Sequence, residues 1–194
     1  AAPDAWITVL KNYGTMSFGE VASSAIKYAR EGITVHPTMS KFLSRDQENY
    51  RMWPSNSNIW QKNGHPLEVG DLLIQTDLAA SIQFMADQEA AAMKDGREKG
   101  LQAARDAFYV GDIASKIVKY HKENGGLMTA DDMASYTTPI EKPLSINFRG
   151  TEVYSCRPWC QGPVLLQMLN MLNDIDLKAM GHNSTNYIHY LAET

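Results

Sequence analysis

The sequence predicts an α+β fold that is mostly helical and contains one β-hairpin. Apolar residues recur at helical spacing through most of the chain, with Gly, Ser, Thr and Asp at the ends of the runs. From Leu144 the period changes to two, which is typical of strands. A length of 194 residues, with 44% apolar and 21% charged residues, is typical of a globular protein. We therefore expect one domain over residues 1–194.

The first two helices are marked by the residues at their ends. Asp4 is placed to cap the N-terminus of the first helix, and Gly14 lies where a C-terminal cap belongs. In the second helix, Ser17 and Glu20 have the spacing of a capping box, and Gly32 follows the last apolar residue. These end signals predict two helices separated by a short connection.

The segment over residues 33–70 has no clear period. Prolines at positions 37, 54 and 66 interrupt any long element, and the segment is rich in turn residues. Because it also contains two tryptophans, we expect a packed loop rather than disorder. His36 and His65 each precede a proline in this segment, and exposure to solvent is their plain interpretation.

Helical spacing returns at Leu78 and continues along most of the chain up to Gly125. Gly96 and Gly100 predict a break or an exposed excursion within it, and Gly125 predicts a helix end.

Asp131 and Asp132 resemble at first sight a pair of carboxylates for acid–base catalysis. Adjacent residues point in different directions on a helix, however. Thr129 and Asp132 have capping spacing, so they predict a short helix that ends near Tyr136.

A β-hairpin is predicted after this short helix. Residues 144–148 and 151–156 alternate between apolar and polar side chains, and Arg149 with Gly150 forms the turn between them.

Two more helices follow the hairpin. Pro163 suits the first helical position, and the helix from Val164 is apolar on nearly every side, so we expect it to be buried. The last helix begins at Asn183 and Ser184 and reaches Thr194 without a stop signal. We expect that the natural polypeptide continues, and the start at Ala-Ala-Pro-Asp without a Met fits a trimmed piece or an internal fragment.

Charge and hydropathy exclude two classes of partner. The net charge of -4 and the pI of about 5.7 argue against a nucleic-acid binder, which usually has a basic face. No apolar stretch approaches the roughly 20 residues that a membrane-spanning helix needs. We expect neither nucleic acid nor membrane as a partner.

The two cysteines, Cys156 and Cys160, permit several interpretations. A structural zinc site needs four ligands, and the five histidines show no paired ligand spacing. A disulfide would need an oxidising compartment, and Pro158 stiffens the loop between the two cysteines. A cysteine nucleophile would need His182 or His189 to fold close to it as a base. Free, partly buried thiols are what we expect.

Other catalytic patterns give no complete set. The serine-hydrolase elbow, the zinc-protease helix, the phosphate loop and the dinucleotide fingerprint are all absent from the sequence. Thr137 or Thr138 could act as an N-terminal nucleophile only after cleavage, and nothing marks a cleavage point there. We expect no metal, no cofactor and no self-sufficient catalytic set in this chain.

Several stretches, in order, resemble the large subunit of γ-glutamyltranspeptidases. The resemblance runs from about Ala5 to Glu193, and the ordered series carries it rather than any one motif. The stretches are YGTMSFGEVA, HPLEVGDLLIQTDLAASIQFMA, FYVGDIA, GGLMTADDMASY and FRGTEVYS.

The resemblance implies an N-terminal-nucleophile hydrolase with a four-layer αββα fold. In this family a zymogen cuts itself into a large and a small subunit, and the new N-terminal threonine attacks a γ-glutamyl amide such as glutathione. The α-amine of that threonine acts as base, and the glutamyl group passes to water or to an amino acid or peptide acceptor.

The resemblance also implies that this chain is an internal segment of the large subunit. The catalytic threonine would lie beyond Thr194, and the arginine that holds the substrate carboxylate would lie before Ala1. No family catalytic residue falls on this sequence, so the segment alone is predicted to be inactive and to need the small subunit as partner. Family members are often periplasmic or secreted, while a cytoplasmic location stays open.

One turn departs from the family pattern. Between the strand and the helix the family usually has a proline-rich run that ends Ser-Ser-Gly-Gly, whereas this chain has Arg-Pro-Trp-Cys-Gln-Gly-Pro at residues 157–163. Gln161 and Gly162 are therefore candidates for residues near the substrate cleft, and a tight strand-to-helix connection is the alternative. The departure leaves open a related acylase or amidohydrolase that acts on another amide. A non-catalytic helical binding module is the third interpretation.

Overall fold

The structure is a computed structural model that describes residues 2–194. It divides into two compact units, one up to Thr138 and one over Pro139–Thr194, and each is described by itself. Both consist mainly of helices, with three two-stranded antiparallel sheets among the described residues. This confirms the predicted mostly helical α+β class, while the single domain over residues 1–194 stays a prediction.

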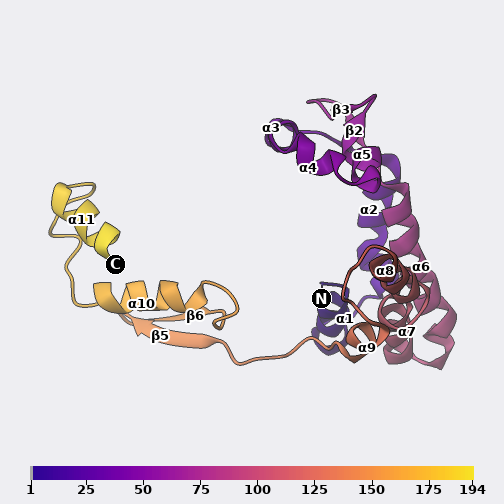
Figure 1. Ribbon diagram of the computed structural model, residues 1–194. Coiled ribbons are helices and arrows are strands. Elements are labelled where there is room, and N and C mark those ends of the chain that lie inside the picture. Colours follow the sequence, from indigo (N-terminus) through magenta and orange to yellow (C-terminus); the bar gives the residue numbers. More distant parts are fainter. Residues whose placement is uncertain (1) are drawn as a thin grey trace. The chain divides into compact units, whose positions relative to one another are not determined.

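The elements of the first unit follow one another closely along the chain (Figure 1). They are α1 (Ala2–Tyr13), α2 (Phe18–Glu31), β1 (Ile33–Thr34), α3 (Pro37–Arg45), α4 (Gln47–Arg51), α5 (Pro54–Trp60), β2 (Gln61–Lys62), β3 (His65–Pro66), β4 (Leu72–Leu73), α6 (Thr76–Ala92), the 3-10 turn η1 (Met93–Asp95), α7 (Arg97–Tyr109), α8 (Asp112–Glu123) and α9 (Ala130–Ser135). The second unit contains β5 (Leu144–Phe148), β6 (Thr151–Ser155), α10 (Gly162–Leu172) and α11 (Thr185–Glu193).

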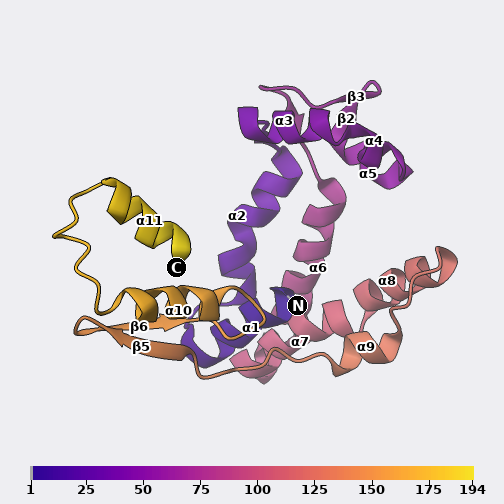
Figure 2. The same ribbon diagram turned by 60° about the vertical axis from the view of Figure 1, so that its left-hand side comes forward.

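The main core of the first unit lies where α1, α2, α6 and α7 meet. α2 and α6 run side by side (Figures 1 and 2), and α7 packs against both α6 and α1. Alanines at several contact positions let the helix axes approach closely. The core residues are Ile7, Phe18, Ala22, Ile26, Met85, Ala86, Leu101, Ala104 and Ala107.

The predicted ends of α2 are confirmed. Ser17 and Glu20 form both bonds of a capping box, and Gly32 ends the helix with a φ of 97°. A third residue, which local sequence does not reveal, completes this helix start. The carboxylate of Glu89 accepts hydrogen bonds from the backbone N–H groups of Phe18 and Gly19, each at 2.7 Å. Glu89 is only 2% exposed, and its bond from Phe18 is buried while that from Gly19 is partly buried.

We predict that Glu89→Ala lowers the free energy of unfolding by about 3 kcal/mol, because the buried N–H of Phe18 and the partly buried N–H of Gly19 lose their acceptor. Denaturant unfolding of the purified protein measures this loss. Gln88→Ala is the matched control on the same helix, since Gln88 is exposed, and it should change stability by less than about 0.5 kcal/mol. Equal effects of the two substitutions would contradict the role assigned to Glu89.

The expected capping role of Asp4 is wrong. Asp4 lies inside the first turn of α1 and is buried, with its carboxylate paired to the guanidinium of Arg105 on α7. The same carboxylate accepts the backbone N–H of Thr138 at 2.7 Å, and Arg105 also donates to the carbonyl of Tyr136. Burial raises the pKa of Asp4, but the hydrogen bonds from Thr138 and Arg105 outweigh it and hold the pKa below its usual value. We call Asp4, Arg105, Tyr136 and Thr138 the Asp4 cluster.

Residues 33–75 contain more regular structure than the sequence predicts. Pro37 and Pro54 each lie in the first turn of a short helix, where the missing N–H costs nothing. His36 and His65 are exposed as expected, and His36 also caps α3 by accepting the N–H of Met39 at 3.3 Å. β1 pairs with β4 and β2 pairs with β3. The predicted packing is confirmed, because a small core forms from Val35, Leu43, Leu67 and Leu73.

The two glycines near residue 100 have different roles. Gly96 separates η1 from α7, as predicted, with a φ of 108°. Gly100 lies inside α7 and is buried, so no excursion occurs there. A Cβ at Gly100 would lie 3.2 Å from the carbonyl oxygen of Glu89, which explains how α7 approaches α6 so closely.

The ends of α8 and α9 follow the prediction. α8 ends before Gly125, which has a φ of 74°. Thr129 and Asp132 form a complete capping box at the start of α9, so Asp132 has a capping role. The hydrogen bond from the side chain of Thr129 holds the pKa of Asp132 below its usual value.

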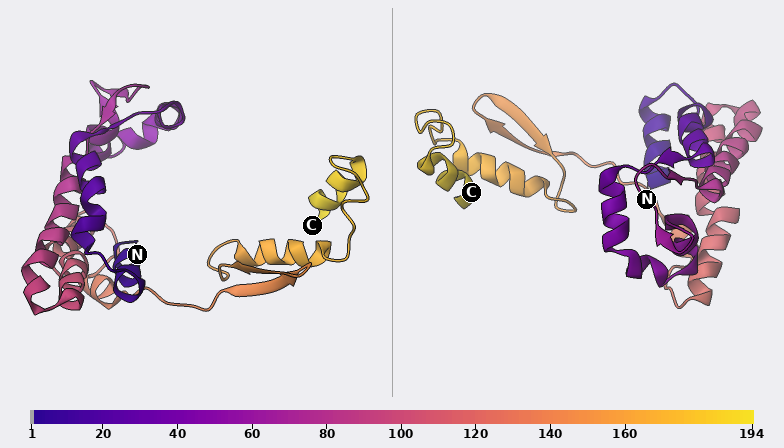
Figure 3. Two further views of the ribbon diagram at one scale, coloured as in Figure 1. Left: turned by 180° about the vertical axis from the view of Figure 1, so that it is seen from behind. Right: turned by 90° about the horizontal axis from the view of Figure 1, so that it is seen from above.

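The predicted hairpin is confirmed in the second unit. β5 and β6 pair antiparallel with Ile146 opposite Val153, and Arg149 and Gly150 form the turn with φ values of 53° and 85°. α10 lies along this hairpin in every view (Figures 1 and 3). Arg149 fixes the far end of α10, because its guanidinium donates to the carbonyls of Leu172 at 2.9 Å and Asn173 at 3.3 Å.

The expectation that α10 is buried is wrong for one of its faces. Leu166 and Leu172 are buried against the hairpin, whereas Val164, Leu165 and Met171 are 52%, 47% and 52% exposed. One face of this apolar helix therefore meets solvent. α11 begins after Ser184, as predicted, and Ser184 caps it by accepting the N–H of Tyr187. Among residues 2–194, no helix has the length and apolar character that a membrane span requires.

Candidate functional site

The turn over residues 156–163 joins β6 to α10 and contains the candidate residues Gln161 and Gly162. The N–H of Cys160 donates to the carbonyl of Arg157 at 3.1 Å, which closes a β-turn with Pro158 in its second position. Gly162 is buried against the backbone of Cys156. A Cβ at Gly162 would overlap the carbonyl oxygen of Cys156 and lie 2.7 Å from its N and C atoms. Only glycine fits this position.

The start of α10 has no side-chain cap. Gln161 occupies the N-cap position, but its side chain makes no capping hydrogen bond and is exposed. Pro163 lies in the first turn, as predicted. The first backbone N–H groups of a helix have no partner within the helix, so an uncapped start can donate to an anion or to a polarised carbonyl oxygen. This is the chemistry that Gln161 and Gly162 could supply.

A cavity of about 340 Å³ lies beside the same turn. Glu141 holds it together, since it accepts the indole N–H of Trp159 at 3.1 Å and lies 3.8 Å from the guanidinium of Arg157. Sequence reasoning missed Glu141, because no periodic pattern links it to residues so far along the chain. Gln161 and Gly162 are not among the lining residues, which are Glu141, Lys142, Pro143, Tyr154, Ser155, Cys156, Arg157 and Trp159.

Both cysteines of the turn are free thiols, as predicted, but both are exposed rather than partly buried. A hydrogen bond with Cys160 raises the pKa of the Cys156 thiol. His182 and His189 have tyrosine rings as aromatic neighbours, at 5.9 Å and 6.1 Å. No group of three metal-ligating side chains occurs in the part of the chain that the structure describes.

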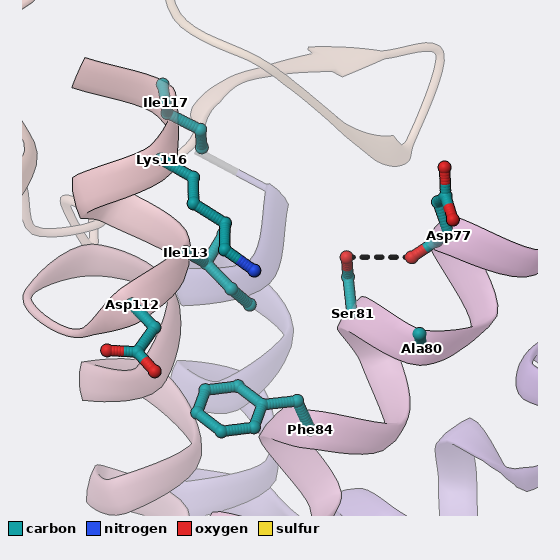
Figure 4. Close-up of a pocket in the computed structure, with 8 residues that line it drawn as sticks. All are labelled: Asp77, Ala80, Ser81, Phe84, Asp112, Ile113, Lys116 and Ile117. Atoms are coloured by element: carbon teal, nitrogen blue, oxygen red, sulfur yellow. Dashed lines mark hydrogen bonds between the residues drawn. The ribbon is translucent and has the colours of Figure 1, made fainter. Parts of the chain in front are cut away.

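A second cleft lies between α6 and α8 in the first unit and has a volume of about 510 Å³. Phe84, Ile113 and Lys116 extend into the space between the two helices (Figure 4). The Ser81 hydroxyl donates to the carbonyl of Asp77 at 2.8 Å, within its own helix. Lys116, Asp77 and Asp112 also line the cleft, but the hydrogen bond of the Ser81 hydroxyl goes to a backbone carbonyl and not to a base.

A third concavity, of about 490 Å³, is almost entirely apolar. Residues from α1, α2, α6 and α7 line it, and Trp6, Val21 and Leu78 among them are 60%, 46% and 45% exposed. Thr138, which the sequence offered as a possible nucleophile, donates its backbone N–H to the carboxylate of Asp4 in the same unit. None of the sites found in residues 2–194 unites a nucleophile, a base and an orienting group.

Comparison with known proteins places the chain in a family. The model of the family described as gamma-glutamyltranspeptidase matches residues 1–194. The chain is 34% identical over 190 residues to the glutathione hydrolase proenzyme of Escherichia coli. This match covers 95% of this chain and 30% of that protein. It is 30% identical over 189 residues to an acylase ACY 1 proenzyme of Pseudomonas sp., covering 97% of this chain and 31% of that protein.

A solved structure agrees with these relatives. The γ-glutamyltranspeptidase of Helicobacter pylori superimposes with a TM-score of 0.83 at 29% identity, over 96% of this chain and 50% of that chain. The chain thus spans about a third of the length of the curated relatives named above. It belongs to the γ-glutamyltranspeptidase family, which includes glutathione hydrolases and related acylases, and it matches a segment of these relatives.

Proposed function

We propose that this chain is scaffold from the large subunit of an enzyme that cleaves γ-glutamyl amides such as glutathione. The observation that carries the proposal is the match of the family model over residues 1–194. A second observation supports it: the described residues provide no complete catalytic set of their own. The enzyme as a whole would have the αββα architecture, to which this chain contributes helices and a hairpin.

The nucleophile in this proposal is an N-terminal threonine on polypeptide outside this chain. Its α-amine takes the proton of its hydroxyl, and the hydroxyl oxygen attacks the γ-carbonyl carbon of the substrate. The amine of the substrate leaves with a proton, and water or an amino acid or peptide then accepts the glutamyl group. Hydrogen-bond donors stabilise the negative charge that develops on the carbonyl oxygen.

The small subunit of the same precursor is the proposed partner. Relatives that are named proenzymes support a precursor that is processed. The exposed apolar face of α10, with Val164, Leu165 and Met171, is the kind of surface that a partner chain covers.

The experiment uses the full-length protein with two substrates, glutathione and an acyl amide that lacks the glutamyl group. The proposal predicts that kcat/KM for glutathione exceeds that for the other amide. The reverse order would favour the second candidate, a related acylase. The 30% identical acylase and the departure from the family pattern at residues 157–163 support this candidate.

Gln161 and Gly162 are proposed to lie near the substrate cleft. If Gln161 contacts the substrate, Gln161→Ala in the full-length protein should lower kcat/KM for glutathione by about tenfold, the effect of one lost hydrogen bond. Gln167→Ala, an exposed glutamine on the same helix, is the matched control and should leave kcat/KM unchanged. An unaltered kcat/KM for glutathione and an unaltered substrate preference in Gln161→Ala would mean that the turn is only a tight connection.

A further inference from the structure

The two cysteines of the turn have no role in the proposed function, and their setting is unusual. Cysteine is among the residue types most often found buried, even when it is not in a disulfide. Here both Cys156 and Cys160 are exposed, and they flank a single turn. An exposed pair of thiols in one small loop calls for a chemical explanation.

The backbone folds the segment that carries the two cysteines into a tight turn. Cys160 donates its N–H to the carbonyl of Arg157 at 3.1 Å, and Gly162 packs on the backbone of Cys156. Pro158 does not oppose this arrangement, because the second position of a β-turn is where its fixed φ is favoured. The loop is therefore set before any bond forms between the thiols.

The two thiols also affect each other's protonation. The Cys156 thiol forms a hydrogen bond with Cys160, which keeps Cys156 protonated to higher pH than an isolated cysteine. A sulfur–sulfur bond would need only local closure of the loop, since β6 and α10 already converge there.

Metal binding explains the pair less well. Two thiolates alone do not complete a tetrahedral zinc site. The charged neighbours of the turn, Arg157 and Glu141, already lie 3.8 Å from each other, and the described residues contain no group of three ligands.

We propose that Cys156 and Cys160 form a reversible intramolecular disulfide by exchange with a small aliphatic disulfide. The Cys160 thiolate attacks one sulfur of that disulfide, which releases one small thiolate and leaves a mixed disulfide. Cys156 then gives up its proton and attacks the Cys160 sulfur, which releases the second small thiolate. The protein loses two electrons and two protons, and the small disulfide gains them as two thiols. This inference does not rest on the proposed function.

The test uses full-length protein, with 2-hydroxyethyl disulfide and 2-mercaptoethanol as the oxidised and reduced probe, because neither contains a γ-glutamyl amide. After equilibration and quenching with acid, free thiols are alkylated. The mass of the peptide that contains both cysteines is then measured by mass spectrometry. The wild type should lose two hydrogen atoms and take up no alkylating agent at this peptide, and dithiothreitol should reverse the change.

Cys156→Ser and Cys160→Ser are the matched variants. Each should stop at a 2-mercaptoethanol adduct on its remaining cysteine, while the wild type should hold about tenfold less adduct, because its second thiol is intramolecular. Three results would overturn the proposal: two alkylated thiols at every ratio of oxidised to reduced probe, as much adduct in the wild type as in the variants, or a disulfide between two protein molecules.

Discussion

Asp4→Ala should lower the free energy of unfolding of the first unit by about 3–5 kcal/mol, the cost of removing one partner from a buried ion pair. The Arg105 side chain is only 12% exposed and would keep its charge without a counter-ion. The backbone N–H of Thr138 would lose its acceptor as well. Denaturant unfolding measures the loss.

Asp95→Ala is the matched control for this prediction. Asp95 is exposed in the same unit, so its removal should change stability by less than about 0.5 kcal/mol. Arg105→Lys should also destabilise the unit, because an ammonium cannot bind the Asp4 carboxylate and the Tyr136 carbonyl in one plane. A stability of Asp4→Ala equal to that of the wild type would contradict the importance of the Asp4 cluster.

The same cluster gives a pH dependence with a definite sign. The pKa of Asp4 is lower in the folded chain than the usual value, so folding favours the ionised carboxylate. Its stabilisation is present above the unfolded pKa of about 3.9 and is lost as pH falls through the folded value. Arg105 and Thr138 face the Asp4 side chain, and the hydroxyl of Tyr109 accepts the backbone N–H of Asp4. The stability difference between wild type and Asp4→Asn should therefore shrink from pH 7 to pH 3, and a constant difference would contradict this origin.

Gly162→Ala should have the second large effect, a destabilisation of the second unit by about 3 kcal/mol, the upper end of the usual cost of overpacking. The new Cβ would overlap the carbonyl oxygen of Cys156 and lie 2.7 Å from its N and C atoms. These are backbone atoms, so no side-chain rotation can relieve the overlap, and β6 and α10 would have to separate.

Hydrogen exchange of the α10 amides measures this effect within the second unit. Faster exchange over Val164–Leu172 is expected for Gly162→Ala. Gln167→Ala, an exposed change on the same helix, should leave the exchange rates as in the wild type. Unchanged exchange in both variants would show that the turn can relax without disturbing the helix.

The sequence predicted those features that depend on neighbouring residues. The capping boxes of Ser17 with Glu20 and of Thr129 with Asp132 span three residues, so their patterns are visible in the sequence. The turn at Arg149 and Gly150 is equally local. The helices of residues 37–60 were missed, because elements of five to nine residues contain too few turns to show a period.

The features that sequence alone could not predict join distant parts of the chain. Glu89 satisfies a helix start 70 residues earlier, and Arg105 pairs with a residue 101 positions away. Asp4 looked like a cap for the same reason: its true partners lie far along the chain. The half-exposed face of α10 was also missed, since an apolar pattern does not say which neighbours cover it.

The candidate site was predicted only in outline. The ordered motifs led to the family that the family model now supports over residues 1–194. The turn over residues 156–163 was singled out by its departure from the family pattern, whereas the fit of Gly162 against Cys156 and the exposure of both thiols depend on backbone geometry. The role of Gln161 and Gly162 near the substrate stays a proposal.

The central claim is that the group that breaks the amide bond lies on polypeptide outside this chain. The most direct measurement compares the release of aniline from a γ-glutamyl anilide by the 194-residue chain and by the full-length protein at equal concentrations. The account predicts turnover by the full-length protein and none above background by the chain alone. Sustained turnover by the purified 194-residue chain would contradict it.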